Sequence, residues 1–454
     1  MLIKDIYINI SKSEGKNVNF FARVRSHRLG KNISFLIVND GSTINDVQIV
    51  YKKDDNFFQE ISQAKVGSIV SIDGTLKVTT EGKQPFEITA NKLFLISNTN
   101  DNYKLQKKEH TYEFLRDIAH LRPRTKTFES VFRLRSSIFQ CIHSFFTEKN
   151  FLFVTTPIIT NNDAEGAGES FITTTITNNN YDNDFFGKKA NLTVSGQLHA
   201  EAFAQAFQNV YTFGPTFRAE KSYTSKHAAE FWMLEPECAN YELKQLMSLI
   251  EDIIKYIIKY ILKHNIDELK YCDENLENGL IDKLHFIENS SFEVVEYSQA
   301  IEILSKAKDN GYNFEEKNIK FGLDLTTEHE RYLCEKHFNK PTFVINYPKE
   351  IKAFYMRLNN DGRTVGAVDL LVPFIGELVG GSEREYDIDK IVKRCNELNI
   401  NRDLLNWYID LRSFGYYKTA GFGLGFERLI MYLTGMTNIR DVIPFPRTVR
   451  NLQF

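Results

Sequence analysis

Two strand-like segments in the middle of the chain, Phe217-Arg-Ala-Glu220 and Glu230-Phe-Trp-Met-Leu-Glu-Pro-Glu237, are separated by a short polar loop. They predict a β-hairpin. Side chains alternate along a strand, so Arg218 and Glu220 share one face of the first strand, and Phe231 shares a face of the second strand with a carboxylate. The hairpin therefore brings a cation, carboxylates and an aromatic ring over one sheet surface. This combination suits a nucleotide, because the ring can stack on a base and cations attract phosphates.

The loop between the two strands adds Lys221, Lys226 and His227. Their charge strengthens the nucleotide interpretation. The residues alone also fit a second interpretation, a charged hairpin on the surface of the protein, and such hairpins are the commoner case. The pattern does not separate the two.

Two glycine-rich segments lie nearer the C-terminus, Gly376-Glu-Leu-Val-Gly-Gly-Ser-Glu-Arg384 and Gly421-Phe-Gly-Leu-Gly-Phe-Glu-Arg-Leu429. The second lacks the spacing and the following βαβ unit of a dinucleotide fingerprint. We expect its glycines to let a ligand approach the strand backbone, with Arg428 at the start of the next helix. Asp369 and Glu377 are eight residues apart, close enough in an antiparallel strand pair to bind one hard cation such as Mg²⁺.

Apolar residues recur every three or four positions over about Phe128–Lys149 and again over Leu243–His264. This spacing predicts two helices, each with one apolar face. Strand signals return at Thr342–Asn346, Ala353–Arg357 and Val365–Val372. Strands mixed with helices, without regular βαβ alternation, predict an α+β domain on an antiparallel β-sheet flanked by helices.

The first 100 residues predict a separate all-β domain. Glycine-bearing turns and one basic turn, Arg25–Lys31, separate five short strand signals. They are Asn19–Val24, Ile33–Val38, Val47–Tyr51, Ser68–Asp73 and Phe86–Leu95. This pattern fits a small closed barrel of the oligonucleotide-binding kind (OB-fold), and it also fits an all-β domain without a ligand. The polar segment after the barrel is a linker, so we divide the chain into 1–100, a hinge at 101–126, and 127–454.

The composition is that of a globular protein, with 42% hydrophobic and 25% charged residues among 454. Thirty-six phenylalanines and 21 tyrosines supply far more buriable surface than disordered chains carry. The net charge of −3 combines a mildly basic region at 1–126 with an acidic remainder. The five cysteines are scattered, without metal-ligand spacing, and no apolar run approaches the length of a membrane span. We expect a cytoplasmic protein with no membrane partner.

Together, these segments resemble the signature motifs of class II aminoacyl-tRNA synthetases over essentially the full length. Residues 127–157 resemble motif 1, 211–237 motif 2 and 421–433 motif 3; the insert at about 271–320 carries no recognisable motif. An N-terminal OB-fold before the catalytic domain is typical of the aspartyl, asparaginyl and lysyl subclass. Four segments look most like those of asparaginyl-tRNA synthetases: Asp163–Phe171, Thr193–His199, Tyr211–Glu220 and Gly380–Arg384.

The resemblance implies an asparagine–tRNA ligase, which uses ATP to activate L-asparagine as an adenylate with release of pyrophosphate and then transfers it to tRNA(Asn). It also implies Mg²⁺ as a cofactor and a homodimer formed through the motif 1 helix. Two alternatives remain: an aspartyl-tRNA synthetase-like enzyme, possibly non-discriminating, or a non-catalytic paralogue that binds tRNA or asparagine.

The same resemblance assigns the nucleotide site. It places the ATP α-phosphate on Arg218, the adenine between Phe231 and Arg428, and the γ-phosphate near His227 and Arg428, which makes the two arginines the catalytic residues. The full ATP set is Arg218, Glu220, Lys226, His227, Phe231, Glu377 and Arg428, and the Mg²⁺ set is Asp369 and Glu377. Stacking of arginine on a base is physically sensible, because guanidinium is planar and weakly hydrated.

For the amino acid, the resemblance implies a set of Glu165, Ser195, Gln197, Glu220, Glu235 and Arg384. In this set Glu165, Gln197 and Glu235 surround the ammonium group, and Arg384 holds the side-chain oxygen. Ala200 stands where aspartyl enzymes have a lysine. Loss of that cation favours a neutral carboxamide, while Glu220 can accept from the amide and repel a carboxylate.

For the anticodon, the resemblance implies a site in the first domain. Phe35 stacks on the central uridine, and Arg28 and Gln48 hydrogen-bond to its edge. Phe35 also fits a core position in an alternating strand.

Overall fold

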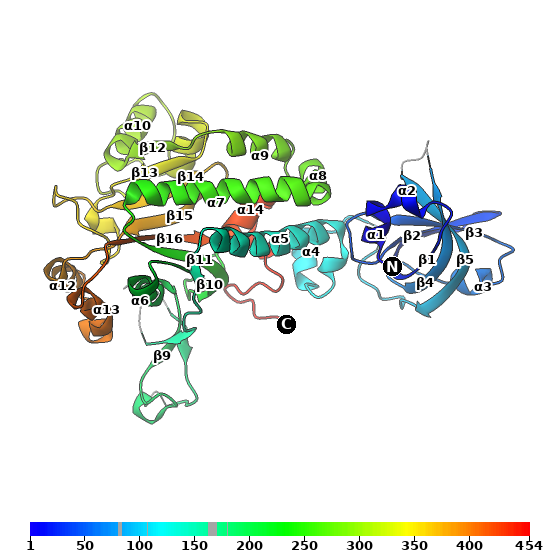
Figure 1. Ribbon diagram of the computed structural model, residues 1–454, viewed down its shortest axis with the longest axis horizontal. Coiled ribbons are helices and arrows are strands. Elements are labelled where there is room, and N and C mark those ends of the chain that lie inside the picture. Colours follow the sequence, from blue (N-terminus) through cyan, green and yellow to red (C-terminus); the bar gives the residue numbers. More distant parts are fainter. Residues whose placement is uncertain (80–83, 107, 162–169, 179) are drawn as a thin grey trace. The chain divides into compact units, whose positions relative to one another are not determined.

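The computed structural model describes residues 1–79, 84–106, 108–161, 170–178 and 180–454. The chain divides into two compact units, Met1–Ser130 and Val131–Phe454. Each is built around its own sheet (Figure 1).

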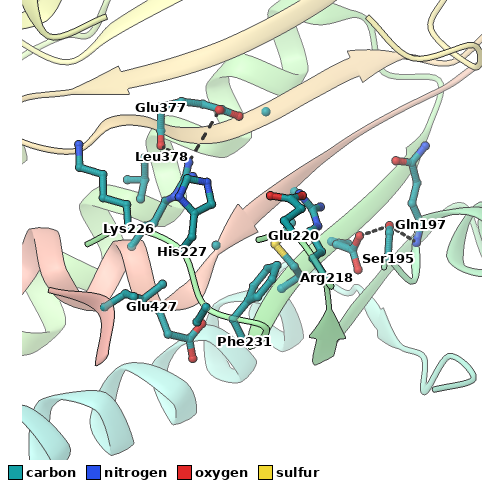
Figure 2. A pocket seen from close by; sticks show the side chains of 18 of the residues that line it. Ser195, Gln197, Arg218, Glu220, Lys226, His227, Phe231, Glu377, Leu378 and Glu427 are labelled. Carbon is teal, nitrogen blue, oxygen red and sulfur yellow. Dashed lines mark hydrogen bonds and ion pairs between the residues drawn. The ribbon is translucent and has the colours of Figure 1, made fainter. Parts of the chain in front are cut away.

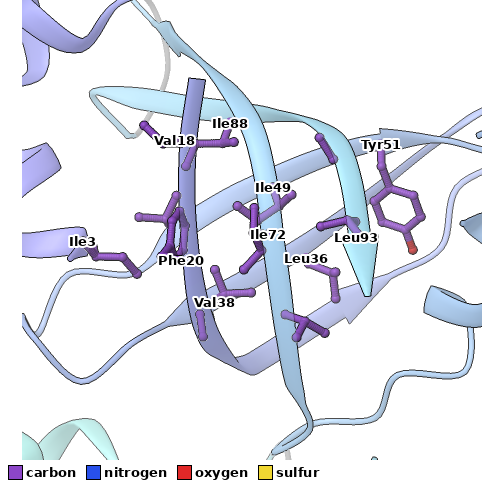
Figure 3. Close-up of a cluster of buried hydrophobic side chains, with 14 of the residues drawn as sticks. Ile3, Val18, Phe20, Leu36, Val38, Ile49, Tyr51, Ile72, Ile88 and Leu93 are labelled. Atoms are coloured by element: carbon purple, nitrogen blue, oxygen red, sulfur yellow. The ribbon is translucent and has the colours of Figure 1, made fainter. Parts of the chain in front are cut away.

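The first unit contains a closed five-stranded barrel with the strand order β1-β2-β3-β5-β4. Its strands are β1 (Asn17–Arg28), β2 (Ile33–Asn39), β3 (Val47–Lys52), β4 (Ile69–Val78) and β5 (Phe86–Ser97). Alternate residues point inward and form one apolar core that also takes in Ile3 of α1 (Ile3–Ile8) (Figure 3). The sequence prediction of an N-terminal barrel is confirmed.

One boundary in the barrel was predicted wrongly. The residues read as the start of a basic turn, Arg25–Arg28, continue β1 instead. A bulge between Val24 and Ser26 shifts the register, and Arg28 then pairs with Phe35 of β2. A bulge inserts one residue and increases the local twist, so the strand continues through a polar stretch that lacks regular alternation.

The second unit is built on an eight-stranded sheet with the order β12-β13-β14-β15-β16-β11-β10-β6. The strands are β6 (Leu152–Phe153), β10 (Asn209–Phe217), β11 (Glu230–Ala239), β12 (Glu293–Glu296), β13 (Thr342–Ile345), β14 (Ala367–Val372), β15 (Gly376–Glu383) and β16 (Thr419–Gly425). Neighbouring strands are antiparallel except at the two ends of the sheet, where β12 joins β13 and β6 joins β10 in parallel. The predicted antiparallel core is therefore confirmed, with parallel edges added.

The two predicted helices are α5 (Lys126–Glu148) and α7 (Leu243–His264), and they lie side by side (Figure 1). The helix α7 packs against β14, β15 and β16 through its apolar face. Adjacent residues of a strand face opposite ways, and Leu246 of α7 lies over Gly381. Gly380 therefore faces the other side of the sheet, and the site lies on that side.

Other elements complete this unit. A three-stranded sheet joins β7 (Ile159–Thr160), β9 (Ala190–Leu192) and β8 (Ile172–Thr173) beside α6 (Gln197–Phe207). The region of the insert holds the end of α8 (Ile266–Asn275), α9 (Leu280–Asn289), β12 and α10 (Tyr297–Asp309), and α10 shares one apolar cluster with β13 and β14. Among the described residues of this unit, the remaining α-helices of more than five residues are α12 (Ile388–Glu397) and α14 (Phe426–Thr434).

The predicted strand at Ala353–Arg357 is wrong. Only Met356 makes a ladder contact there, an isolated bridge to Arg384. Phe354 and Tyr355 instead bury their rings in a cluster with residues of α12 and of α13 (Asn406–Asp410). Tertiary packing of two aromatic side chains thus overrides the strand preference of the local sequence.

Among the described residues, no helix combines the length and the apolar character that crossing a membrane requires.

Candidate active site

A cavity of about 290 Å³ lies over β11, β14, β15 and β16, where α14 begins. All described residues that the sequence assigned to the nucleotide, the amino acid and the metal line it. They are Ser195, Gln197, Arg218, Glu220, Lys226, His227, Phe231, Glu235, Asp369, Glu377, Arg384 and Arg428 (Figure 2). Glu165 lies outside the described residues.

The hairpin of β10 and β11 positions the first group. Its register pairs Phe217 with Glu230 and Thr216 with Phe231, and Arg218 N donates to Ala229 O across 3.0 Å where the strands separate. The Arg218 guanidinium carbon consequently lies 5.5 Å from the centre of the Phe231 ring. A cation and an aromatic face are thus held together at the cavity wall.

Arg428 approaches from the first turn of α14. Its Nη1 donates to Glu377 O across 3.0 Å and lies 3.8 Å from Glu377 Oε2. The preceding residue, Glu427, is buried; its Oε2 accepts from Trp232 N across 2.9 Å, and its Oε1 accepts from Arg135 Nη2 across 2.7 Å. Glu427 therefore ties the helix that carries Arg428 to both β11 and α5.

The loop between the hairpin strands contributes two further basic side chains, Lys226 and His227. Lys226 Nζ donates to Ile375 O across 2.6 Å and to Phe374 O across 3.3 Å. Burial, and then repulsion from Arg331 and Arg428, lowers the pKa of Lys226 to about 8. Burial also lowers the pKa of His227, with Arg428 as the next cause.

Two glutamates, Glu335 and Glu330, hold the β14–β15 turn whose carbonyl groups accept from Lys226. Phe374 has a positive φ of 72° and its N–H donates to Glu335 Oε1, in a π-helical turn (Tyr332–His337). Glu330 Oε2 accepts from Glu377 N across 3.0 Å. Burial and then the Glu377 charge raise the pKa of Glu330 to about 8. π-Helical turns often occur at functional sites, and here one fixes the end of the strand that carries Glu377.

Ser195, Gln197 and Glu235 form the opposite, polar end of the cavity. Ser195 Oγ donates to Glu235 Oε1, Gly196 N donates to Glu235 Oε2 across 2.9 Å, and Gln197 N donates to Ser195 Oγ across 3.1 Å. Burial raises the pKa of Glu235, and the hydrogen bonds from Ser195 and Gly196 oppose the rise. Gln197 Nε2 is buried and has no hydrogen-bond partner among the described residues, which leaves it available to a ligand.

Arg384 lies at the same end, and its partners were missed by sequence reasoning. Its Nε donates to Glu237 Oε2 across 3.1 Å, Nη2 donates to Glu237 Oε1, and Nη1 donates to Ser382 Oγ across 2.7 Å. Among the described residues, each terminal nitrogen of Arg384 therefore has one N–H group that makes no hydrogen bond. The signal in the sequence is the alternation of β11, which puts Glu237 on the face of Glu235.

Asp369 and Glu377 converge over Gly380. A Cβ added to Gly380 would lie 2.9 Å from Glu377 Oε1 and 3.4 Å from Asp369 Oδ1, so both carboxylates cover the bare backbone. Lys352 Nζ, which sequence reasoning also missed, binds Asp369 Oδ2 at 2.5 Å. Burial raises the pKa of Asp369, and Lys352 opposes the rise. The two carboxylates supply oxygen ligands of the kind that Mg²⁺ prefers, while no cluster of three or more potential metal ligands occurs among the described residues.

The three residues predicted to read the anticodon lie on the outer surface of the barrel. Phe35 is half-buried between the inward-pointing Ser34 and Leu36, so it is not a core residue. The Arg28 guanidinium lies 5.8 Å from the Phe35 ring centre, and Gln48 Nε2 donates to Glu87 Oε2 across 3.3 Å. An aromatic ring and polar side chains thus meet on one accessible face.

Comparisons with known proteins agree with this arrangement. Residues 111–449 match the family of class II tRNA synthetases (D, K and N), and residues 18–96 match the OB-fold nucleic acid binding domain. The chain is 60% identical to an asparagine–tRNA ligase of Mycoplasma mycoides over 100% of both chains, and 50% identical to one of Clostridium acetobutylicum over 100% of this chain and 99% of the other.

A solved structure of an asparaginyl-tRNA synthetase has the same fold. The crystal structure of asparaginyl-tRNA synthetase from Pyrococcus horikoshii, complexed with asparaginyl-adenylate, superimposes with a TM-score of 0.87 at 30% identity, covering 97% of each chain. With full-length identity of this level and a family match over most of its length, the chain belongs to the class II aminoacyl-tRNA synthetases and, within them, to the asparagine–tRNA ligase family.

Proposed function

We propose that the protein is an aminoacyl-tRNA synthetase that joins L-asparagine to tRNA(Asn) at the expense of ATP. The observation that carries this proposal is the meeting, in one cavity, of two nucleotide-type arginines with a carboxylate site for an ammonium group. Arg218, Arg428 and Glu235 all line this cavity. Membership of the asparagine–tRNA ligase family supports the choice of amino acid.

ATP binds along the hairpin and the first turn of α14. The adenine lies between the Phe231 ring and the Arg428 guanidinium, and Arg218 contacts the α-phosphate. Lys226 and His227 lie beside Arg428 and suit the outer phosphates, because each can donate and Lys226 is charged below about pH 8. Glu220 and Glu377 complete the set of ATP residues.

Asp369 and Glu377 would hold Mg²⁺, which supplies positive charge against the phosphate oxygens. The donor set fits: Asp369 Oδ1 and Glu377 Oε1 lie over the same glycine, and Lys352 takes the other Asp369 oxygen.

Activation needs no nucleophilic side chain. A carboxylate oxygen of asparagine bonds to the α-phosphorus, the bond from that phosphorus to the oxygen bridging the β-phosphate breaks, and pyrophosphate leaves. Arg218 neutralises charge on the α-phosphate as the reaction proceeds, while the cavity orients both reactants. In the second step a ribose hydroxyl of the tRNA 3′ end attacks the carbonyl carbon, loses its proton and displaces AMP.

The polar end of the cavity binds asparagine. Glu235 compensates the substrate ammonium group, and Gln197 and Ser195 add polar contacts; we assign Glu165 to the same group. The two remaining N–H groups of Arg384 hold the side-chain oxygen, and Glu220 accepts from the amide nitrogen. Arg384 already forms an ion pair with Glu237. Its positive charge therefore attracts an anionic substrate side chain less strongly than the charge of an isolated arginine would.

The barrel binds tRNA. We assign residues 1–100 to anticodon binding through Arg28, Phe35 and Gln48, residues 101–126 to a hinge, and residues 127–454 to catalysis. The match of the barrel to nucleic-acid-binding OB-folds and the accessible position of Phe35 support this division.

We also propose a homodimer that includes the motif 1 region and a location in the cytoplasm, where the substrates of translation occur. In support of the dimer, β6 forms one edge of the main sheet and exposes 43% of Leu152 and 42% of Phe153. An exposed apolar edge strand favours pairing with another chain. Light scattering would test the dimer, with Leu152→Asp expected to shift the mass toward a monomer.

The test of the activity is ATP–pyrophosphate exchange with each of the twenty amino acids in turn. Asparagine should give the fastest exchange, and charging of tRNA should follow the same preference. Faster activation of aspartate would assign the protein to aspartyl-type chemistry, and no exchange with any amino acid would show that it is not a synthetase.

A further inference from the structure

Glu201 of α6 is the centre of a buried hydrogen-bond network behind the cavity. The side chain is fully buried, with 0% of its surface exposed. Its Oε1 accepts from the Tyr408 hydroxyl across 2.8 Å, and its Oε2 accepts from Arg412 Nη2 across 2.8 Å and from the Tyr416 hydroxyl across 2.7 Å. A buried carboxylate is costly unless it is fully hydrogen-bonded and paired, so this network is a specific arrangement rather than an accident of packing.

The network reaches the cavity through Arg384. Glu201 Oε1 lies 3.8 Å from Arg384 Nε. Arg412 Nε donates to Glu385 O across 3.0 Å, which holds the backbone directly after Arg384. Glu201 does not line the cavity, and Arg384 does. Any effect of Glu201 on a ligand is therefore exerted through the position and the charge of Arg384.

Opposite charges lie close together in this region. Two guanidinium groups, Arg384 and Arg412, lie among two carboxylates, Glu201 and Glu237, all four of them buried. Charges act over longer distances in a buried site than in water, because the surroundings screen them less. An incoming carboxylate would meet Arg384 with its charge already opposed from two sides, whereas a neutral carboxamide would lose little.

We propose that Glu201 is a positioning and specificity-determining residue, which orients Arg384 and opposes its charge so that the cavity prefers a carboxamide to a carboxylate. This inference rests on the proposed activation of L-asparagine. Part of the preference for the side chain of asparagine over that of aspartate then comes from a residue that does not touch the substrate.

The test is the isosteric substitution Glu201→Gln, which removes one negative charge and keeps the shape. Aspartate is used as an inhibitor of asparagine-dependent pyrophosphate exchange, so the readout does not require aspartate to be activated. We expect the Ki of aspartate to fall about tenfold relative to the KM of asparagine, since Arg384 then attracts an anion more strongly. If Glu201 had a purely structural role, its substitution would weaken the binding of aspartate and of asparagine by the same factor.

Three further variants accompany Glu201→Gln. Tyr416→Phe removes one hydrogen bond to Glu201 without a change of charge, so the ratio of Ki to KM should remain that of the wild type. Arg412→Gln changes the charge in the opposite direction, so aspartate should inhibit it less than it inhibits the wild type. Glu201→Asp keeps the charge and should keep the ratio.

The outcomes separate this inference from the proposed function. A wild-type protein that does not activate asparagine would overturn the function itself. Asparagine activation with an unchanged ratio in Glu201→Gln would overturn only the role of Glu201. If Glu201→Gln does not fold, Arg412→Gln decides the question, and failure of both to fold would assign the network to stability alone and overturn the proposal.

Discussion

Arg384 and Glu237 face one another at the polar end of the cavity, with Arg384 Nε donating to Glu237 Oε2 across 3.1 Å and a second bond from Nη2 to Oε1. A lysine has one nitrogen and cannot both keep this pair and present two N–H groups to a ligand. We expect Arg384→Lys to lower kcat/KM for asparagine by about a hundredfold. The KM for ATP should change little, because Arg384 is not among the residues that we assign to ATP. Pyrophosphate exchange, with asparagine and ATP varied separately, measures both.

The matched control is Arg402→Lys, the same change at an exposed position. Its kinetics should equal those of the wild type. Equal losses for asparagine and ATP in Arg384→Lys would contradict the assignment.

Arg218 and Arg428 are each expected to be essential for adenylate formation. Removing a charge that stabilises a developing negative charge typically lowers the rate by about 10²–10³. We therefore predict a loss of at least about a hundredfold in pyrophosphate exchange for Arg218→Ala and for Arg428→Ala. Thermal unfolding of both variants should stay close to that of the wild type, since neither side chain belongs to the apolar core. Unchanged exchange in either variant would refute its catalytic role.

Lys226 should make ATP use sensitive to mildly alkaline pH. Its pKa is lowered to about 8, first by burial, so it is charged below that pH and loses its proton as the pH rises through it. Since phosphate binding needs the charge, kcat/KM for ATP should fall as the pH rises through about 8. Lys226→Arg keeps its charge throughout and should show a flatter profile between about pH 7 and 9. Lys221→Arg, at an exposed lysine of the same loop, should follow the wild-type profile.

Gly380 is predicted to be required for the metal response. An alanine Cβ there would lie 2.9 Å from Glu377 Oε1 and 3.4 Å from Asp369 Oδ1, so at least the first carboxylate must move. We expect Gly380→Ala to raise the Mg²⁺ concentration for half-maximal exchange by about tenfold. Gly214→Ala is the control, because an added Cβ at this strand glycine meets nothing within 4 Å. A Mg²⁺ requirement that is equal in both variants would contradict the Asp369–Glu377 assignment.

Phe35 should contribute to tRNA binding and not to amino-acid activation. Stacking of a base on an aromatic ring is worth about 1–3 kcal/mol, so Phe35→Ala should raise the KM for tRNA by about five- to a hundredfold. Pyrophosphate exchange without tRNA should remain unchanged. Phe21, exposed on the same barrel, provides the control substitution Phe21→Ala. A similar loss of tRNA charging in both variants would mean that Phe35 has no special role.

Local pattern was enough to predict the elements whose periodicity is strong. The helix at Leu243–His264 was predicted with the bounds that the structure shows, because its apolar stripe is long and uninterrupted. The five barrel strands were likewise placed in the right order along the chain. The hairpin is confirmed, but its first strand, β10, ends at Phe217, so Arg218–Glu220, which were predicted as part of it, lie beyond the strand. Arg25–Arg28 and Ala353–Arg357 were predicted wrongly, since a bulge and the packing of two aromatic rings decided those segments.

The charge partners within the site could not be predicted. Arg384 and Glu237 lie 147 residues apart in the sequence, and Arg412 and Glu201 lie 211 apart. A sequence pattern gives the face on which a residue lies, but not the strand or helix that this face meets. The pairs depend on strand order and register across the sheet, which a single sequence does not contain.

Glu427 joins three parts of the second unit, since it accepts from Trp232 N in β11 and from Arg135 in α5, and lies next to Arg428. Because Glu427 is buried and hydrogen-bonded on both sides, the turn that carries Arg428 depends on the position of α5 as well as on that of β11. We therefore expect a change in the packing of α5 to alter the position of Arg428 without contact with the cavity itself.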